Sequence, residues 1–219
     1  MFKQYTEILL ELLANYGKSI SEDQYGSILL DSYVKNLDEH FKSMSIMDGL
    51  KHVISKTQEN CKIGNFNVYT YGPNDLIGVY VHTSSTPNAG MKASYVVLSS
   101  NKKVDESLRQ FAEKLAMQVV ASNPKFLNKE SVPAERLEAE RKIFVENVLA
   151  EGKKPEHVDK IVNSKINGWY EETVLNEQQF LIIDHDEEGG KSKVSQVVQK
   201  KGKELGLEDL HIKDFKLFI

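Results

Sequence analysis

The sequence is poor in the residues that build disulfide frameworks and metal sites. Its 219 residues include one cysteine, Cys61, which excludes an intramolecular disulfide framework and a cysteine-rich zinc site. Scarce cysteine also favours a reducing compartment. No apolar run approaches the length of a membrane span, and the start at Met1-Phe2-Lys3 predicts an amphipathic helix rather than a signal peptide.

An excess of positive charge is also absent. The chain has 28 Lys and Arg against 32 Asp and Glu, a net charge of −4, which argues against a dedicated nucleic-acid binder but leaves a local basic patch open. Its 40% apolar and 27% charged content is ordinary for a soluble globular protein. The length suffices for one large domain or two small ones.

No pattern typical of catalysis or metal binding is found. The histidines form no pair at i, i+4, and the sequence run Gly189-Gly190-Lys191-Ser192 lacks the first glycine of a phosphate-binding loop. It also follows an acidic stretch, 184–188, that would repel phosphate, so we expect a charged loop there. The paired carboxylates Asp38/Glu39 and Glu171/Glu172 point to different sides of their helices and are interpreted as solvated charge. The histidines are His40, His52, His82, His157, His185 and His211.

His82 has two interpretations. It ends an apolar predicted strand beside Tyr80 and precedes a small, polar loop, so it could contact a partner. Alternatively, it is a half-buried residue tied to the loop backbone, which the pattern by itself favours. Cys61 has no sequence-adjacent base and is expected to be a buried or inert thiol.

Residues 132–180 contain a predicted helical hairpin. Apolar residues follow a helical period on both sides of a break at Gly152-Lys153-Lys154-Pro155, where glycine suits a helix end and proline a helix start. We expect the two apolar stripes to face each other, and the outer face is left open for a partner. The stripes are Leu137, Phe144, Val145, Val148 and Leu149, then Val158, Ile161, Val162, Ile166 and Trp169.

The remaining periodicity predicts an α+β fold. Strands are expected at 63–71, 76–82, 91–99 and 210–219, where apolar residues alternate, with turns or loops at 72–75 and 83–90. Asp105 is expected to cap the helix that ends at Ser122. In the segment 21–41 we expect Leu29, Leu30, Val34 and Leu37 to be buried. The other predicted helices cover 2–16, 21–30, 33–41, 48–56 and 194–205.

Several motifs together resemble bacterial-type elongation factor Ts. The family has Gly-Lys-Pro, Leu-Leu-Glu-Gln-Pro-Phe, Ile-Ala-Met-His-Ile-Ala-Ala-Ser-Asn-Pro, Tyr-Ile-His and Lys-Ile-Gly-Glu-Asn. The matches run in order over about four-fifths of the chain, which chance motifs rarely do. The corresponding residues here are Gly152-Lys153-Lys154-Pro155, Leu175-Asn176-Glu177-Gln178-Gln179-Phe180, Leu115-Ala116-Met117-Gln118-Val119-Val120-Ala121-Ser122-Asn123-Pro124, Tyr80-Val81-His82 and Lys56-Thr57-Gln58-Glu59-Asn60.

This resemblance implies two small α+β core subdomains with antiparallel sheets packed by helices, and a helical hairpin inserted in the second. The expected boundaries are 1–75 for the first subdomain, 76–131 with 174–219 for the second, and 132–173 for the hairpin. The family's amino-terminal ubiquitin-associated-like domain, its Thr-Asp-Phe-Val wedge and the two preceding strands have no counterpart here. The strand at 63–71 would therefore lack partners. The loop 83–87 replaces a shorter glycine-rich turn.

The resemblance further implies a guanine-nucleotide exchange factor that binds elongation factor Tu and releases GDP, without catalysis, cofactor or metal. Tyr80, His82 and the segment Lys56, Thr57, Gln58, Glu59 and Asn60 are the implied contact residues, and exchange is expected to be weak without the wedge. Direct binding of nucleotide, nucleic acid or membrane is not expected. The alternative is a non-exchanging structural or assembly module. Self-association through the hairpin or strand 63–71 stays open, and the expected location is the bacterial-type cytoplasm, with an organellar origin open.

Overall fold

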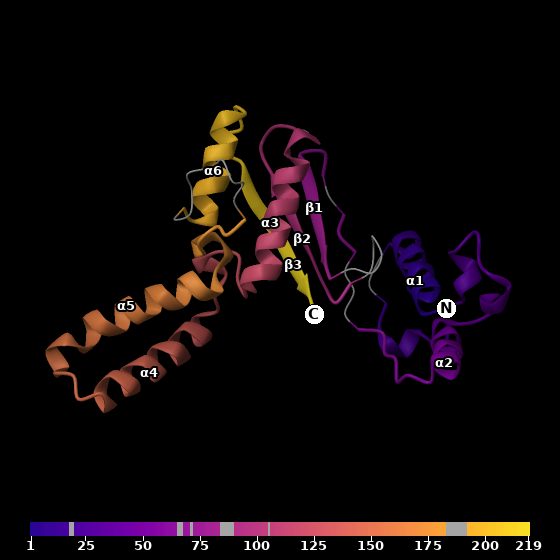
Figure 1. Ribbon diagram of the computed structural model, residues 1–219, viewed down its shortest axis with the longest axis horizontal. Coiled ribbons are helices and arrows are strands. Elements are labelled where there is room, and N and C mark those ends of the chain that lie inside the picture. The colour runs from indigo at the N-terminus through magenta and orange to yellow at the C-terminus, as the bar shows by residue number, and fades with distance from the viewer. Residues whose placement is uncertain (18–19, 65–67, 71, 84–89, 105, 183–191) are drawn as a thin grey trace. The chain divides into compact units, whose positions relative to one another are not determined.

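The computed structural model describes residues 1–17, 20–64, 68–70, 72–83, 90–104, 106–182 and 192–219. The chain divides into two compact units, Met1–Thr70 and Tyr71–Ile219, each with its own core. Figure 1 labels the helices and strands of both units.

The first unit contains two helices joined by irregular chain. Helix α1 (Phe2–Tyr16) and helix α2 (Ile46–Thr57) flank three short 3-10 turns, and both helices contribute to one apolar core together with Leu30 and Phe41 of the second and third turns. Tyr5 lies at the centre of this core, because its ring stacks on Phe41 at 5.7 Å and its hydroxyl donates to the carbonyl of Ile46. The 3-10 turns are Glu22–Gln24, Leu30–Ser32 and Glu39–Phe41.

The predicted helices at 21–30 and 33–41 are wrong. Polar side chains there bond to backbone outside a helical pattern: Asp38 accepts from the N–H of His40, two residues on, and Asp31 accepts from the N–H of Ser43, twelve residues on. A local bond such as that of Asp38 competes with helix formation. Leu29 was expected to be buried but is 44% exposed, whereas its neighbour Leu30 is fully buried.

The predicted strand at 63–71 is not found in its described part. Residues 63–64 and 68–70 have no strand conformation, and 65–67 and 71 lie outside the described residues. A strand needs a neighbour to satisfy its backbone groups. In the described part of this unit no neighbouring strand is present.

The second unit is built on an antiparallel sheet of three strands in the order β1-β2-β3. They are β1 (Asp75–His82), β2 (Lys92–Ser99) and β3 (His211–Phe218), close to the predicted 76–82, 91–99 and 210–219. Side chains alternate between two faces. Val96 and Leu98 point into the core, whereas Tyr95 and its cross-strand neighbour Lys216 lie on the opposite face.

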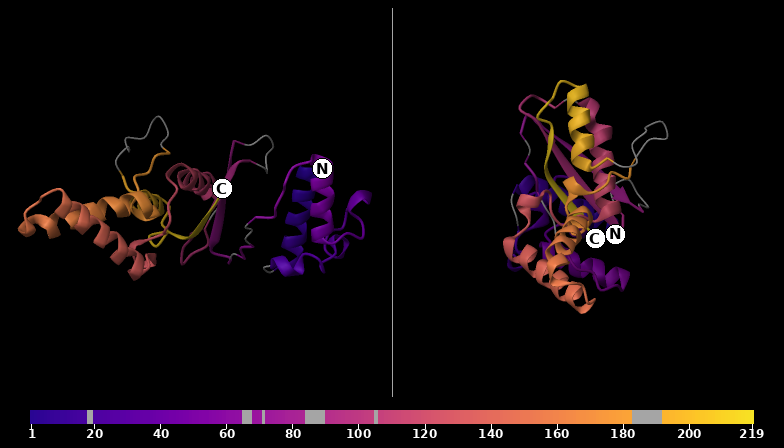
Figure 2. Two further views of the ribbon diagram at one scale, coloured as in Figure 1. Left: turned by 90° about the horizontal axis from the view of Figure 1, so that it is seen from below. Right: turned by 90° about the vertical axis from the view of Figure 1, so that its left-hand side faces the viewer.

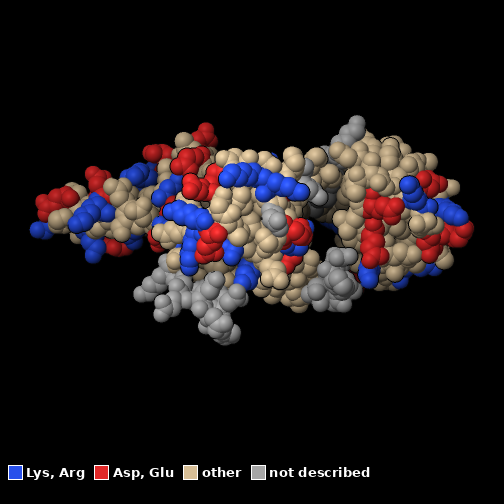
Figure 3. Space-filling model, turned by 90° about the horizontal axis from the view of Figure 1, so that it is seen from above, with Lys and Arg blue, Asp and Glu red and all other residues tan. Residues whose placement is uncertain are grey.

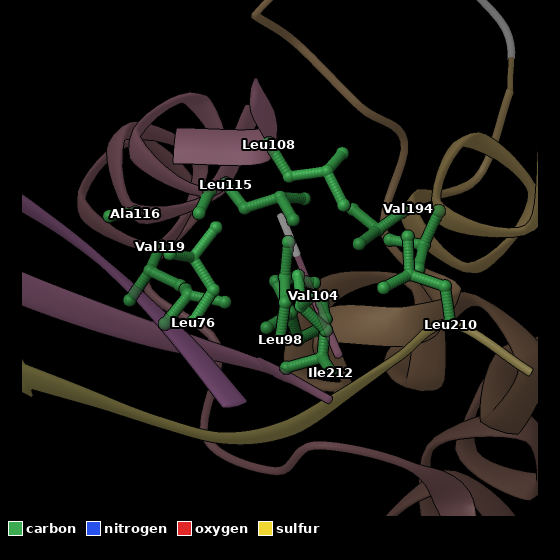
Figure 4. Close-up of a cluster of buried hydrophobic side chains, with 14 of the residues drawn as sticks. Leu76, Leu98, Val104, Leu108, Leu115, Ala116, Val119, Val194, Leu210 and Ile212 are labelled. Carbon is green, nitrogen blue, oxygen red and sulfur yellow. The ribbon is translucent and has the colours of Figure 1, made fainter. Parts of the chain in front are cut away.

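Helices α3 (Arg109–Ser122) and α6 (Val194–Glu204) contribute to the core on one face of this sheet. Figure 4 shows the side chains of this core, with Leu115 of α3, Val194 of α6 and Ile212 of β3 converging between the helices and the sheet. The predicted cap Asp105 lies outside the described residues. The apolar stripes of the sequence predicted α3 and α6, and the structure confirms both helices.

Gly78 determines how closely α3 approaches the sheet. A Cβ atom at this position would lie 2.2 Å from the carbonyl carbon of Ala112 on α3, far inside van der Waals contact. Only a residue without a side chain allows the two backbones to come this close.

The hairpin consists of α4 (Ala134–Ala150) and α5 (Pro155–Thr173), as predicted (Figure 2). Gly152 has φ 70 at the turn and Pro155 begins α5. The inner stripes form a small core of their own, except that Leu149 is 51% exposed and Trp169 packs on Phe126 at 6.1 Å between ring centroids. Charges of both signs are interspersed along its surface (Figure 3).

The structure confirms the α+β class, with one antiparallel sheet among the described residues. The division between the units falls after Thr70, compared with the expected boundary at residue 75. The separation of 132–173 from 76–131 and 174–219 stays a prediction. No helix in the described residues is long and apolar enough to cross a membrane.

On the sheet face away from α3, the Asp75 carboxylate accepts from Ser99 Oγ at 2.6 Å, Lys213 Nζ at 2.7 Å and the N–H of Gly72 at 2.9 Å. Burial raises the pKa of this carboxyl, but the three hydrogen bonds outweigh burial and lower the pKa to about 2. Because Asp75 lies on β1 and Lys213 on β3, their ion pair spans the full width of the sheet.

The Gly78→Ala substitution should destabilise the second unit by about 1–3 kcal/mol, because α3 must move away from β1. Urea unfolding monitored on the second unit measures this. The matched control is Gly168→Ala on α5, where a Cβ meets nothing within 4 Å and should stabilise by about 0.5–1 kcal/mol. Equal stability of Gly78→Ala and the parent chain would contradict the packing argument.

A lowered carboxyl pKa stabilises the fold only while the carboxylate is ionised. The contribution of Asp75 should therefore be complete above its unfolded pKa of about 3.9 and disappear as the pH falls towards 2. Lys213→Met should remove part of this pH dependence, and Lys92→Met should not. Unfolding free energies at pH 5, 4, 3 and 2.5 test it, and parallel pH curves for Lys213→Met and the parent chain would refute it.

Candidate partner-binding site

The structure brings Tyr80 and His82 together at the end of β1. Both lie on the core-facing side of the strand, where Tyr80 packs against the core and His82 is exposed. The Tyr80 hydroxyl lies 3.0 Å from His82 Nδ1, and the ring centroids are 5.9 Å apart. The half-buried tyrosine thus orients an exposed imidazole whose Nε2 has no partner among the described residues.

The backbone after His82 is tightly constrained. Thr83 has φ 51, an unusual value for a β-branched residue. The N–H of Met91 donates to the His82 carbonyl at 3.2 Å, and a Cβ at Gly90 would lie 2.4 Å from that same oxygen. Residues 84–89, where the loop departs from the family pattern, lie outside the described residues.

The second predicted contact segment, Lys56, Thr57, Gln58, Glu59 and Asn60, belongs to the first unit and ends α2. Gln58 closes the helix in the left-handed conformation, with φ 58 and its N–H 2.9 Å from the Ile54 carbonyl. Thr57 Oγ1 donates back to Val53 at 3.0 Å. Lys56, Glu59 and Asn60 are exposed, so their side chains are accessible to a partner.

The other candidate groups form no metal-binding cluster among the described residues. No group of three or more His, Cys, Asp or Glu in that part of the chain could hold a metal ion. Cys61 is half-buried against the core of the first unit. His185 and Gly189-Gly190-Lys191 lie outside the described residues.

Sequence reasoning missed a buried polar network at the base of the hairpin. Gln118 of α3 is fully buried; its Nε2 donates to the Gln179 carbonyl at 3.0 Å and its Oε1 accepts from the N–H of Leu181 at 2.8 Å. Gln178 accepts from Ser122 Oγ at 2.6 Å and donates to the Glu172 carbonyl at 2.7 Å. The network joins α3 to the carboxyl end of α5.

A second polar cluster surrounds Glu177 at the same base. Its carboxylate pairs with Lys193 at 2.7 Å and with Lys129 at 3.3 Å, and the Lys193 hydrogen bond holds the pKa of Glu177 below its ordinary value. Lys193 also pairs with Glu171 of α5 at 3.6 Å. Lys129 lies 5.2 Å over the Tyr170 ring, so α5, α6 and the chain before α4 meet at one point.

These networks unite two of the motifs that carry the family resemblance. Gln118 and Ser122 come from the run 115–124, and Gln178 and Gln179 from the run 175–180. The available sequence signal was a glutamine beside the apolar stripe of α3, at a position that has histidine in the family motif. Pairing it with Gln178 required the tertiary structure, because the two are sixty residues apart in the chain (178 − 118).

Gln118→Leu should destabilise the second unit by about 1–3 kcal/mol, because it leaves the Leu181 N–H and the Gln179 carbonyl without their partner. Gln110→Leu, on an exposed position of the same helix, is the control and should change stability little. Denaturant unfolding distinguishes the two. Unchanged stability of Gln118→Leu would show that the network does not hold the hairpin base.

Comparison with known proteins gives a consistent result. A family model described as Elongation factor TS matches residues 12–219. The chain is 33% identical to elongation factor Ts of Orientia tsutsugamushi (strain Boryong) over 150 residues, which cover 68% of the chain and 46% of that protein.

Two further relatives extend the comparison. Elongation factor Ts of Anaplasma marginale (strain St. Maries) is 26% identical over 216 residues, covering 99% of the chain and 70% of the relative. A mitochondrial elongation factor Ts of Ostreococcus tauri is 36% identical over 141 residues, which cover 64% of the chain and 40% of the relative. The chain spans about half the length of several of the curated relatives it matches. Since the family model covers nearly all of its residues, the chain belongs to the elongation factor Ts family.

Proposed function

We propose that this chain binds elongation factor Tu and promotes the release of GDP from it through protein–protein contact. The observation that carries the proposal is the Tyr80–His82 pair, in which a half-buried tyrosine holds an exposed histidine at the end of β1. Membership of the elongation factor Ts family supports the choice of partner.

The pair is suited to contact because it is already ordered. Fixing the imidazole through Nδ1 leaves Nε2 for a partner and reduces the entropy lost when the complex forms. The exposed end of α2, with Lys56, Glu59 and Asn60, supplies a second contact surface on the first unit.

Exchange follows from binding energy and needs no covalent chemistry. A factor that binds the nucleotide-free form of elongation factor Tu more tightly than the GDP form must weaken GDP binding by the same ratio. The proposal therefore assigns His82 and its neighbours the role of contact residues, with no catalytic role. We place this activity in the cytoplasm of a bacterial-type cell, or in an organelle of bacterial origin.

A second candidate is an assembly module that keeps the family fold without exchange. Ile143 and Leu149 favour it, because these apolar side chains are 47% and 51% exposed on the hairpin and offer a surface to a different partner. The two functions differ in whether elongation factor Tu is bound through His82.

His82→Ala should weaken binding to elongation factor Tu about five- to tenfold, because it removes a pre-ordered exposed contact. Tyr80→Phe should give a smaller loss, since it only frees the imidazole from the hydroxyl. Affinity is measured by titration with purified elongation factor Tu, and exchange by release of a fluorescent GDP analogue. His157→Ala, an exposed histidine in the first turn of α5, is the control.

Three outcomes separate the candidates. Binding and exchange that fall together in His82→Ala support the exchange factor. Binding without accelerated GDP release favours the assembly module. If the parent chain at micromolar concentration does not bind elongation factor Tu, the proposed function is wrong.

A further inference from the structure

Met91 is an apolar side chain exposed to water beside the proposed contact site. It is 76% exposed, and among the large hydrophobic side chains of the described residues only Ile219, at the end of the chain, is more exposed. Single exposed apolar residues are common on protein surfaces, so the position of Met91 matters more than its exposure.

The backbone holds Met91 next to His82. The N–H of Met91 donates to the His82 carbonyl at 3.2 Å, and a Cβ at Gly90 would lie 2.4 Å from the same oxygen and 2.7 Å from Val81 Cγ1. The lack of a side chain at Gly90 therefore allows the two segments to approach closely. Since hydrogen-bonded neighbouring segments lie about 5 Å apart, a partner bound to the His82 imidazole is within reach of Met91.

The thioether of Met91 brings a chemistry that aliphatic side chains lack. Its unbranched, polarizable chain adapts to the surface of a partner. It also reacts with hydrogen peroxide: the sulfur lone pair attacks one oxygen, the O–O bond breaks, an S–O bond forms and the other oxygen leaves as water. The sulfur loses two electrons to the peroxide. The product is a polar sulfoxide, which methionine sulfoxide reductases convert back to the thioether.

The other four methionines are less exposed than Met91. Met44 and Met47 are half-buried against the core of the first unit, and Met117 is half-buried on α3. Met1 is 42% exposed at the start of the chain. Because a peroxide must reach the sulfur to oxidise it, Met91 is the methionine of this chain that should react first.

We infer that Met91 is a further contact residue for elongation factor Tu, and that its oxidation by a peroxide weakens this contact reversibly. The contact rests on the proposed function, whereas the order in which the methionines are oxidised does not. Oxidation replaces an apolar surface by a polar S–O group, whose desolvation opposes binding. Reduction of the sulfoxide restores the apolar side chain.

Peptide mapping by mass spectrometry after graded treatment with hydrogen peroxide tests the site. The full chain is treated, the peroxide is removed, and a thiol reductant restores Cys61 while leaving methionine sulfoxide in place. Met91 should gain an oxygen atom at least about threefold faster than Met44, Met47 or Met117. A rate at Met91 no higher than theirs overturns the inference.

Titration with untreated elongation factor Tu tests the consequence. The oxidised parent chain should bind about three- to tenfold more weakly than the untreated chain, and methionine sulfoxide reductases should restore its affinity. Peroxide should not change the affinity of Met91→Leu, because the sulfur is gone. Met117→Leu is the matched control and should keep the loss seen in the parent chain. Met91→Gln, which is polar without any oxidant, should reproduce the weakened binding.

The outcomes separate this inference from the proposed function. If the parent chain binds elongation factor Tu and oxidation of Met91 leaves the affinity unchanged, the proposed function stands and the inference is wrong. A loss of affinity that persists in Met91→Leu also overturns it. If the untreated chain does not bind, the proposed function and the contact role of Met91 are both refuted, and the peptide map still decides whether Met91 is oxidised first.

Discussion

The close approach of α3 to β1 at Gly78 is the constraint on which the second unit depends. With no side chain between the two backbones, the apolar stripe of α3 reaches the core face of the sheet, and Leu115 and Val119 are completely buried there. The same approach brings Arg109 to the Ile77 carbonyl and positions Tyr80 against the core. The partner-binding candidate at the end of β1 is therefore oriented by a backbone contact made four residues earlier in the strand.

Two polar clusters determine how the hairpin leaves this core. A buried side-chain amide needs hydrogen-bond partners. Gln118 and Gln178 each find them in the backbone of the segments that the network joins. The Glu177 cluster adds charge at the rim. An apolar base would have allowed several packings of similar energy, whereas directional bonds select one. The hairpin is thus anchored at its base and has its own small core along its length.

The sheet of the second unit has two open edges with different properties. At β1, Arg109 covers a carbonyl and the strand ends in an exposed histidine. At β3, the edge groups are accompanied by a groove and by charges of opposite sign flanking Phe215. Exposed edges promote association unless they are blocked.

The sequence by itself determined the strongly periodic elements. The helices of the hairpin, α1, α3 and α6, and the three strands of the sheet follow from apolar spacing, and Gly152 and Pro155 set the hairpin turn. The sequence also named the family, because ordered motifs survive where overall identity is low. It failed at 21–41, where side chains of Asp31 and Asp38 accept hydrogen bonds from backbone groups, and in the described part of 63–71, where alternation alone does not stabilise a strand without a neighbour.

Only the tertiary structure decided which distant residues act together. Gln118 and Gln178 each resemble an ordinary polar residue until folding places both at the hairpin base. The Asp75–Lys213 pair depends on strand order, and the Tyr80–His82 contact on which face of β1 the two side chains share. The physical reason is that a sequence encodes local spacing directly, whereas contacts between segments depend on how closely backbones approach, here at Gly78.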